Sequence, residues 1–262
     1  MLLAIDVGNT KIAFGFFEEG KLLTTLSAAT SIRRLADDYA ALIFNLLPRH
    51  NVSPDQISEA VICSVVPPLI PVFDEMCRHY LNCTPLVIEA GVKTGVRVRL
   101  DNPKEVGGDR IVNAAAAYKL YGGPAIVLDF GTALTFDIVS AQGDYTGGAI
   151  APGMEIAAES LFMRAAKLPR VELVAPKHAI AKNSVTAMQS GIVFGYVALV
   201  EGMLNRLQQE LSEKAQVIAT GGYAEVIAKQ TKMIDIVDSH LTLIGLQLIH
   251  ELNKGDGKHA YR

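Results

Sequence analysis

The stretch that decides the fold is "LLAIDVGNTKIAFGFF" at residues 2–17. It joins an apolar strand pattern to an Asp-x-Gly turn, a few polar residues and a second β-rich run. The same order of features returns at residues 125–140 as "AIVLDFGTALTFDIVS", in which Asp129 corresponds to Asp6. A duplicated strand–turn–strand unit predicts two similar α/β domains, related by internal duplication, with a cleft between them.

Strand and helix patterns alternate along the remaining sequence, and no low-complexity linker separates the two halves. We place the boundary near residue 120, so that the first domain covers residues 1–120 and the second covers residues 121–262. The longest run without charged residues, 183–200, contains polar side chains. It predicts a buried helix rather than a membrane span.

Composition limits the function classes. The 262 residues are 50% hydrophobic and 19% charged, which is enough for a large core. A net charge of -3 gives no electrostatic basis for binding nucleic acid or an anionic membrane. The three cysteines have no metal-ligand spacing, and the N-terminus lacks the basic region of a signal peptide. We therefore expect a cytoplasmic protein.

The two Asp-x-Gly turns predict a phosphate site. A tight turn exposes backbone N–H groups, and glycine lets a phosphate approach closely. Carboxylates at Asp6 and Asp129 can hold a cation between phosphates. Further polar side chains near the turns are Asn9, Thr10, Lys11, Thr132 and Thr135. One such turn alone favours a plain hairpin, and Lys11 fits solvent as well as phosphate; two turns in matching contexts favour phosphate binding.

A second candidate site is "EVGGDRIVNAAAAY" at residues 105–118. Two glycines lead into Asp109 and Arg110, and an alanine-rich helical segment follows. Asp109 has two interpretations, a helix cap or a catalytic acid–base group. A cap contributes about 1 kcal/mol and Ser or Asn would serve as well, so capping alone does not explain an acid beside Arg110. Both roles are compatible.

Five motifs carry a resemblance to a known family. In chain order, between Asp6 and Gly222, they are "DVGNTK", "EVGGDRIVNAAAAY", "DFGTALTFD", "GGAIAPG" and "ATGG". The sequence thereby resembles the type III pantothenate kinases of the acetate and sugar kinase/Hsp70/actin superfamily. The resemblance implies two ribonuclease-H-like domains and a homodimer. It also implies ATP-dependent phosphorylation of pantothenate at its 4′ hydroxyl, the first step of coenzyme A biosynthesis, with Mg²⁺ and a monovalent cation, K⁺ or NH₄⁺.

The resemblance also implies residue roles. The ATP-binding residues would be Asp6, Val7, Gly8, Asn9, Thr10, Lys11, Ile12, Ala13 and Thr132. The pantothenate-binding residues would be Gly107, Gly108, Asp109, Arg110 and, from the partner subunit, Ser184. Asp109 would be the catalytic base, Asp129 a ligand of the monovalent cation, and Asp6 a candidate Mg²⁺ ligand. Gly221 and Gly222 would lie near adenosine.

The sequence departs from the family pattern at three positions: Ser184 replaces threonine, Gly108 replaces alanine and Leu100 replaces tyrosine. Two other functions remain open. One is a non-catalytic homologue, since the family includes proteins described as transcriptional activators; the retained aspartates speak against it. The other is a kinase of a different small alcohol or carboxylate, which the Gly-Asp-Arg motif disfavours.

Overall fold

The computed structural model describes residues 1–254, which form two compact units. The first unit comprises residues 1–116 together with the chain from Leu241, and the second comprises residues 117–240. The expected boundary near residue 120 lies close to residue 117, where the chain passes from the first unit into the second. The structure differs at the other end of the chain, because the C-terminal helix belongs to the first unit.

Helix α7 (Leu241–Asn253) joins the first unit through its apolar face. Leu243, Leu246 and Ile249 recur at helical spacing and lie in one buried cluster with Leu2 and Val61 of the first sheet. Burial of these side chains removes apolar surface from water, at about 1.5–3 kcal/mol for each large residue. The hydrophobic effect therefore holds α7 on the first unit.

The first unit is built on a sheet with the strand order β3-β2-β1-β4-β5. Its strands are β1 (Leu2–Val7), β2 (Lys11–Glu18), β3 (Lys21–Ala29), β4 (Glu59–Ser64) and β5 (Leu86–Val87). Strand β2 runs antiparallel to β1 and β3, whereas β4 runs parallel to both β1 and β5. Strands β2 and β3 are joined by a hairpin turn at Glu19 and Gly20, both of which have positive φ.

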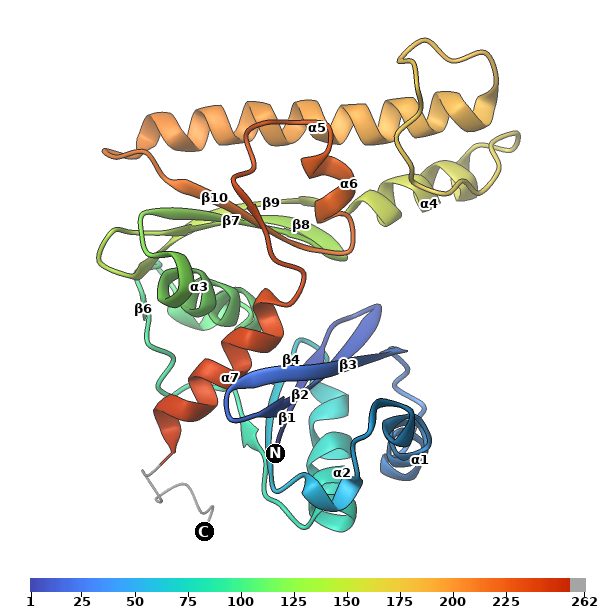
Figure 1. Ribbon diagram of the computed structural model, residues 1–262. Coiled ribbons are helices and arrows are strands. Elements are labelled where there is room, and N and C mark those ends of the chain that lie inside the picture. Colours follow the sequence, from blue (N-terminus) through green and yellow to red (C-terminus); the bar gives the residue numbers. More distant parts are fainter. Residues whose placement is uncertain (255–262) are drawn as a thin grey trace. The chain divides into compact units, whose positions relative to one another are not determined.

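Helices cover both faces of this sheet (Figure 1). The α-helices are α1 (Ala36–Leu46), α2 (Ile70–Leu81), α7 and the start of α3 (Gly108–Tyr121). Short elements are η1 (Leu47–His50), η2 (Pro54–Gln56), η3 (Pro67–Leu69), η4 (Pro103–Glu105) and β6 (Arg97–Val98). Helices α1 and α2 bury one face around Phe14, Tyr39 and Phe73, while α3 and α7 cover the opposite face.

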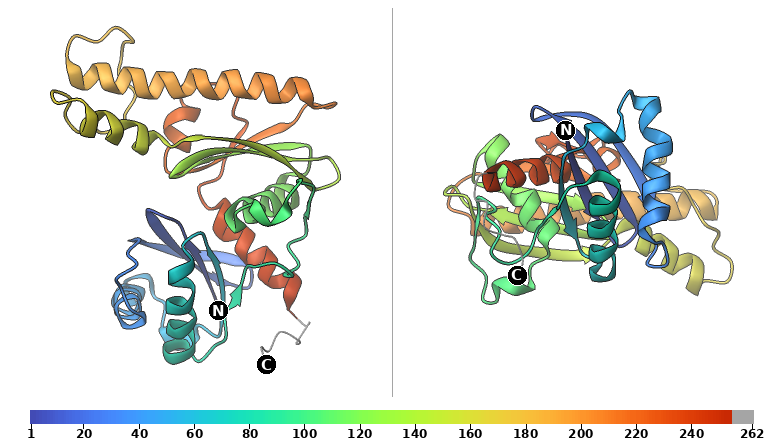
Figure 2. Two further views of the ribbon diagram at one scale, coloured as in Figure 1. Left: turned by 180° about the vertical axis from the view of Figure 1, so that it is seen from behind. Right: turned by 90° about the horizontal axis from the view of Figure 1, so that it is seen from below.

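The second unit repeats this plan. Its strands are β7 (Ala125–Phe130), β8 (Ala133–Val139), β9 (Asp144–Pro152), β10 (Gln216–Gly221) and β11 (Ile236–Val237). They follow the order β11-β10-β7-β8-β9, with β8 antiparallel to β7 and β10 parallel to it. The helices are α4 (Met154–Arg164), α5 (Ser184–Glu210) and α6 (Ala224–Ala228). Figure 2 shows α4 and α5, in yellow-green and orange, side by side.

The duplication read from the sequence is present in the fold. Strands β1 and β7 each have six residues, all buried except the fifth, which is a half-buried aspartate in both. Each leads through a glycine turn into an antiparallel strand and has a parallel strand on its other side. The two units are ribonuclease-H-like domains, as expected.

Helix α5 has 27 residues and is, within residues 1–254, the one helix long and apolar enough to cross a membrane. Its buried residues, however, recur at helical spacing from Met188 through Val193 and Tyr196 to Leu204. They pack into the core of the second unit. This one-sided burial is typical of a core helix, in keeping with the sequence interpretation.

Candidate active site

The first phosphate turn connects β1 to β2. The Gly8 N–H donates to the Lys11 carbonyl at 3.0 Å, and the Thr30 hydroxyl donates to the Gly8 carbonyl at 2.7 Å. A Cβ on Gly8 would lie 2.9 Å from the Lys11 carbonyl oxygen, so the turn requires glycine. Asn9, Thr10 and Lys11 are exposed at its tip. The turn therefore offers polar groups to an anion from a fixed backbone.

Not every residue of the predicted ATP loop can contribute a side chain. Val7 and Ile12 are fully buried in the core on the α1–α2 face, so only their backbone atoms can reach a nucleotide. Asp6 and Ala13 are half-buried and pair across the β1–β2 ladder. The polar contribution of this loop consequently comes from Asp6 and from the exposed turn.

Asp6 and the helix start that carries Asp109 both lie next to Cys63. In the parallel β1–β4 ladder Asp6 is opposite Cys63, on the face that carries Leu2 and Val61 and is covered by α3. Burial raises the pKa of the Cys63 thiol well above its ordinary value, and the nearby charges of Asp6 and Asp109 raise it further. Two carboxylates from distant parts of the sequence thus converge on one buried thiol.

Helix α3 begins at Gly108, so Asp109 lies inside its first turn rather than at the capping position before it. Its Oδ1 accepts a hydrogen bond from the Arg110 N–H at 2.9 Å. A first-turn N–H has no partner within the helix, and a carboxylate there is also favoured by the helix dipole. Asp109 thus satisfies a backbone N–H group as a capping residue would. It does so from two residues after Gly107, the capping position, rather than from that position itself.

Gly107 gives this carboxylate its space. A Cβ at residue 107 would collide with Oδ1 of Asp109. Gly108 is also confined, since a Cβ there would lie 3.1 Å from the Cys63 Sγ. The departure at Gly108 therefore matches the thiol beneath it, because an alanine methyl would press on the sulfur.

The environment of Asp109 makes it a stronger base than an exposed aspartate. Burial raises the pKa of its carboxyl group, while the Arg110 N–H hydrogen bond and the Arg110 charge act in the opposite direction. Perturbed carboxyl groups of this kind are typical of functional sites. Leu100, where the family has tyrosine, lies in the segment between β6 and α3 and is half-buried.

The second phosphate turn connects β7 to β8. The Gly131 N–H donates to the Ala133 carbonyl at 3.1 Å, which makes this turn shorter than the first. Thr132 is exposed at the tip, and its carbonyl accepts from the Gly153 N–H at 3.1 Å. The Thr135 hydroxyl instead donates to the buried carboxylate of Asp137 at 2.7 Å, so its hydroxyl hydrogen is directed into the fold.

Asp129 packs closely against a glycine of the neighbouring strand. Gly221 has φ +90, and a Cβ on it would lie 2.7 Å from the Asp129 Oδ1 and 2.6 Å from the Phe130 N. Gly222 has no other group within 4 Å of its Cβ position and is exposed. Gly221 therefore lies against Asp129, the candidate ligand of the monovalent cation. Gly222 has the open space expected beside a ligand.

Ser184 is the first residue of α5 and is exposed. Asn183 caps the helix, because its Oδ1 accepts from the Thr186 N–H at 2.9 Å. This cap fixes the backbone that carries the Ser184 hydroxyl. The serine is thus presented at an ordered helix start.

The residues present fit a nucleotide with its cations. Among residues 1–254, no three His, Cys, Asp or Glu side chains gather in a metal-binding group. Mg²⁺ usually takes only one or two protein carboxylates together with substrate phosphates and water. Single carboxylates at Asp6 and Asp129, each next to a turn with exposed polar groups, suit that mode of binding.

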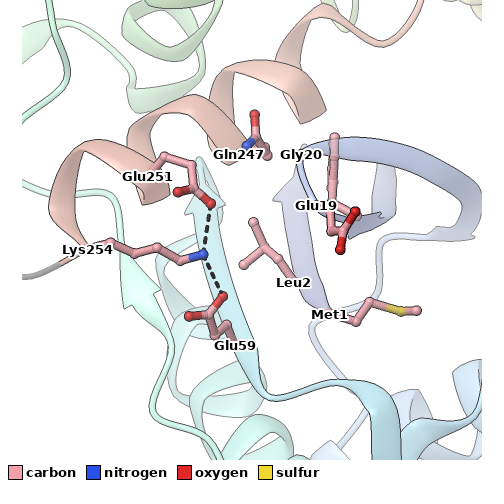
Figure 3. Close-up of a pocket in the computed structure, with 9 residues that line it drawn as sticks. Met1, Leu2, Glu19, Gly20, Glu59, Gln247, Glu251 and Lys254 are labelled. Atoms are coloured by element: carbon pink, nitrogen blue, oxygen red, sulfur yellow. Dashed lines mark hydrogen bonds and ion pairs between the residues drawn. The ribbon is translucent and has the colours of Figure 1, made fainter.

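A pocket of about 440 Å³ lies at the other end of β1 (Figure 3). Its lining includes Leu2 and Glu59, the first residues of β1 and β4. Lys254 closes one side by contacting Glu59 at 3.1 Å and Glu251 at 2.8 Å. Ligands of open α/β sheets bind at the carboxyl ends of parallel strands, where Asp6 lies, so this pocket is separate from the candidate active site.

Comparison with known proteins decides the family, since residues 2–206 match the model for type III pantothenate kinase. The chain belongs to the type III pantothenate kinase family. The family member from Moorella thermoacetica is 51% identical over 253 residues, covering 97% of this chain and all of the relative (100%). The one from Dehalococcoides mccartyi is 49% identical over 253 residues, covering 97% of this chain and 96% of the relative.

Solved structures share the fold of this pantothenate kinase family member at lower identity. A Campylobacter jejuni protein assigned to the Baf family of transcriptional activators has a TM-score of 0.61 at 19% identity, covering 96% of this chain and 98% of the other. An inorganic polyphosphate/ATP-glucomannokinase from Arthrobacter has a TM-score of 0.51 at 16% identity, covering 96% and 98%. These likenesses concern the fold alone.

Sequence reasoning proposed both Asp-x-Gly turns and Asp109 as site residues, but it gave Cys63 no role. The β1–β4 register that sets Cys63 beside Asp6 joins residues far apart in the sequence. Periodicity within each strand contains no signal for that pairing.

Proposed function

We propose that this chain transfers the γ-phosphoryl group of ATP to the 4′ hydroxyl of pantothenate, with Asp109 as the base. This reaction is the first step of coenzyme A biosynthesis. The observation that carries the proposal is that Cys63 pairs with Asp6 in the β1–β4 ladder and also lies against Gly108, the residue before Asp109, within one unit. It brings the candidate base to the strand end from which the first phosphate turn emerges.

Phosphoryl transfer depends mainly on positioning and on charge stabilisation. ATP, when bound, supplies the electrophilic phosphorus. The Asp109 carboxylate accepts a hydrogen bond from the attacking hydroxyl, orients its oxygen and takes its proton late in the transfer. The helix start and Gly107 hold that carboxylate in one position. Exclusion from solvent strengthens its basicity.

Charged and polar side chains complete the proposed site. The Arg110 guanidinium pairs with the carboxylate of pantothenate, for which its planar fork is suited. Lys11, Thr10 and the turn N–H groups bind phosphate oxygens on the first unit, and Thr132 does so on the second. Asp6 holds Mg²⁺, and Asp129 holds K⁺ or NH₄⁺. These assignments are supported by the exposure of both turn tips and by the carboxylate next to each turn.

We further propose that the protein is a homodimer in the cytoplasm, with Ser184 reaching the pantothenate of the partner subunit. The solvent-facing side of α5 supports this arrangement, since Gly191, Gly195, Ala198 and Gly202 are exposed there and leave room for a close helix approach. All three cysteines are free thiols, which suits a reducing compartment.

The test is an ADP-release assay with pantothenate, acetate or glucose as acceptor, in K⁺, NH₄⁺ or Na⁺. We expect pantothenate-dependent release in K⁺ or NH₄⁺. Asp109→Asn should lower kcat by about 10²–10⁴-fold with the protein still folded, because an amide cannot take the proton. The matched control Asp55→Asn, at an exposed aspartate of η2, should keep full activity.

Two results would contradict the proposal. Release that is independent of pantothenate under every cation would exclude the substrate. Unchanged turnover in folded Asp109→Asn would exclude the base while leaving the kinase activity intact.

A further inference from the structure

The C-terminal end of α2 turns back on itself at two cysteines. Asn82 follows the helix with φ 51, in the left-handed region. Its N–H donates to the carbonyl of Cys77, and the Cys83 N–H donates to the same carbonyl at 3.2 Å. The chain reversal therefore places Cys83 directly beside the last turns of the helix that carries Cys77.

The two thiols contact each other. The Cys77 and Cys83 side chains are joined by a hydrogen bond and belong to the same buried cluster. The third cysteine, Cys63, packs in the cluster on the opposite face of the sheet. Backbone bonds to a shared carbonyl thus hold one specific pair of sulfur atoms together, apart from the third.

We propose that Cys77 and Cys83 form a redox-active dithiol, which a hydroperoxide converts reversibly into an intramolecular disulfide. Nothing in the phosphoryl-transfer chemistry uses these residues. The backbone already brings them together, through the two N–H groups that share the Cys77 carbonyl. Intracellular disulfides of this kind act as redox sensors rather than as permanent crosslinks.

The surroundings assign different roles to the two sulfur atoms. The hydrogen bond from Cys77 lowers the pKa of Cys83, and the Arg78 charge acts in the same direction against burial and Glu59. The same hydrogen bond, together with burial, raises the pKa of Cys77. Cys83 is 9% exposed whereas Cys77 is fully buried, so Cys83 is the sulfur that peroxide reaches first and Cys77 is the resolving thiol.

Arg78 is anchored where its charge can act. Its Nε donates to the Asp74 Oδ2 at 2.8 Å, and its Nη1 donates to the Thr84 Oγ1 at 3.1 Å. The second bond ties the guanidinium to the residue that follows Cys83. An electropositive group beside a partly accessible thiol is the setting in which cysteines react with peroxide.

The proposed chemistry balances. The Cys83 thiolate attacks one oxygen of the peroxide, the O–O bond breaks, and Cys83 becomes a sulfenic acid with release of hydroxide. The Cys77 sulfur then attacks the Cys83 sulfur, the S–O bond breaks, and the departing oxygen with the thiol proton leaves as water. Two thiols lose two electrons in total, and the peroxide is reduced to two molecules of water.

The experiment treats the full-length, reduced protein with hydrogen peroxide and counts thiols by alkylation and mass spectrometry. We expect two of the three cysteines to become unreactive together, and the intact mass to fall by two hydrogen atoms. Trypsin cleaves after Arg78, between the two cysteines, so the disulfide joins two peptides that fragmentation can map. Dithiothreitol should restore all three thiols.

Two variants assign the roles. Cys83→Ser should leave the remaining thiols unoxidised, whereas Cys77→Ala should stop at the sulfenic or sulfinic acid of Cys83. The proposal is overturned if three free thiols persist in the native wild-type protein under peroxide that oxidises glutathione. It is equally overturned if fragmentation of the linked peptides places Cys63, which shares the tryptic peptide 50–78 with Cys77, in the disulfide. The thiol count of the wild-type chain decides the matter even where a variant does not fold, and it does not depend on the kinase proposal.

Discussion

Asp109 combines three local features that single-residue propensities treat separately. It bonds a first-turn N–H of α3, faces a buried thiol and lies against a glycine that leaves room for its carboxylate. The motif singled out this residue, because a capping role alone does not require an acid, and its role as base stays a prediction. It could not predict Cys63 or its contact with Asp6, since that contact depends on the pairing of β1 with β4.

The raised pKa of Asp109 predicts a cost in stability at neutral pH. Because burial favours the protonated carboxyl in the folded state, the native protein loses stability as the pH rises from the ordinary aspartate range through the raised pKa. Asp109→Asn should therefore raise the melting temperature of the ligand-free protein at pH 7.5, and the gain should shrink towards pH 4. Thermal unfolding across pH measures this; a variant less stable at every pH would contradict it.

Gly221 and Gly222 provide a matched pair at the second turn. Gly221→Ala should destabilise the protein by about 1–3 kcal/mol and disturb Asp129, because residue 221 has a left-handed backbone and no room for a methyl group. Gly222→Ala has open space and should stay within about 0.5 kcal/mol of the wild type. Urea unfolding and the K⁺ dependence of activity measure the two effects. Equal behaviour of the two variants would refute this interpretation.

At the scale of elements, the repeated strand–turn–strand pattern was readable because both strands are apolar and almost wholly buried and the aspartate recurs at one place. Helix α1 was less well defined, since Ser31 precedes its helical pattern and is a residue type that often caps helices, but the helix begins only at Ala36. Its first turn is closed by Asp38, whose Oδ2 accepts from the Leu35 N–H at 2.9 Å. A serine before a helical pattern is a weak start signal when an acid further along can bind the same kind of backbone group.

Helix α5 carries the prediction about assembly. Gly195→Arg would add a large charged side chain to its exposed small-residue face, whereas Gln209→Arg adds the same charge near the end of the helix. We expect the wild type and Gln209→Arg to sediment as dimers and Gly195→Arg as a folded monomer. Sedimentation velocity with circular dichroism decides this, and a dimeric Gly195→Arg protein would remove α5 from the interface.

At the scale of the whole molecule, the sequence predicted two related domains but assigned the C-terminal helix to the second. The apolar stripe of α7 predicts that one face of the helix is buried, but it does not predict which of the two sheets covers that face. The choice depends on the complementary face of Leu2, Ala4 and Val61, which no pattern in the 241–253 segment contains. Long-range packing of this kind is set by shape and volume rather than by local preference.

Two leucines of α7 test its place in the first unit. Leu246 is fully buried there, so Leu246→Ala should lower the free energy of unfolding by about 2–5 kcal/mol and weaken the first unit before the second. Leu252 is 53% exposed, and Leu252→Ala should change little. Denaturant unfolding with hydrogen exchange would resolve both. Loss of protection confined to residues 117–240 in Leu246→Ala would contradict the assignment.

The split composition of the first unit has a consequence for synthesis on the ribosome. Its sheet is translated early, but α7, which covers one face of that sheet, is translated only after residues 117–240. Translation proceeds at about 5–20 residues per second, so the apolar face around Leu2 and Val61 remains without α7 for on the order of ten seconds. During that interval the nascent chain exposes apolar surface of the kind that chaperones recognise, and the unit that contains Asp109 is completed last.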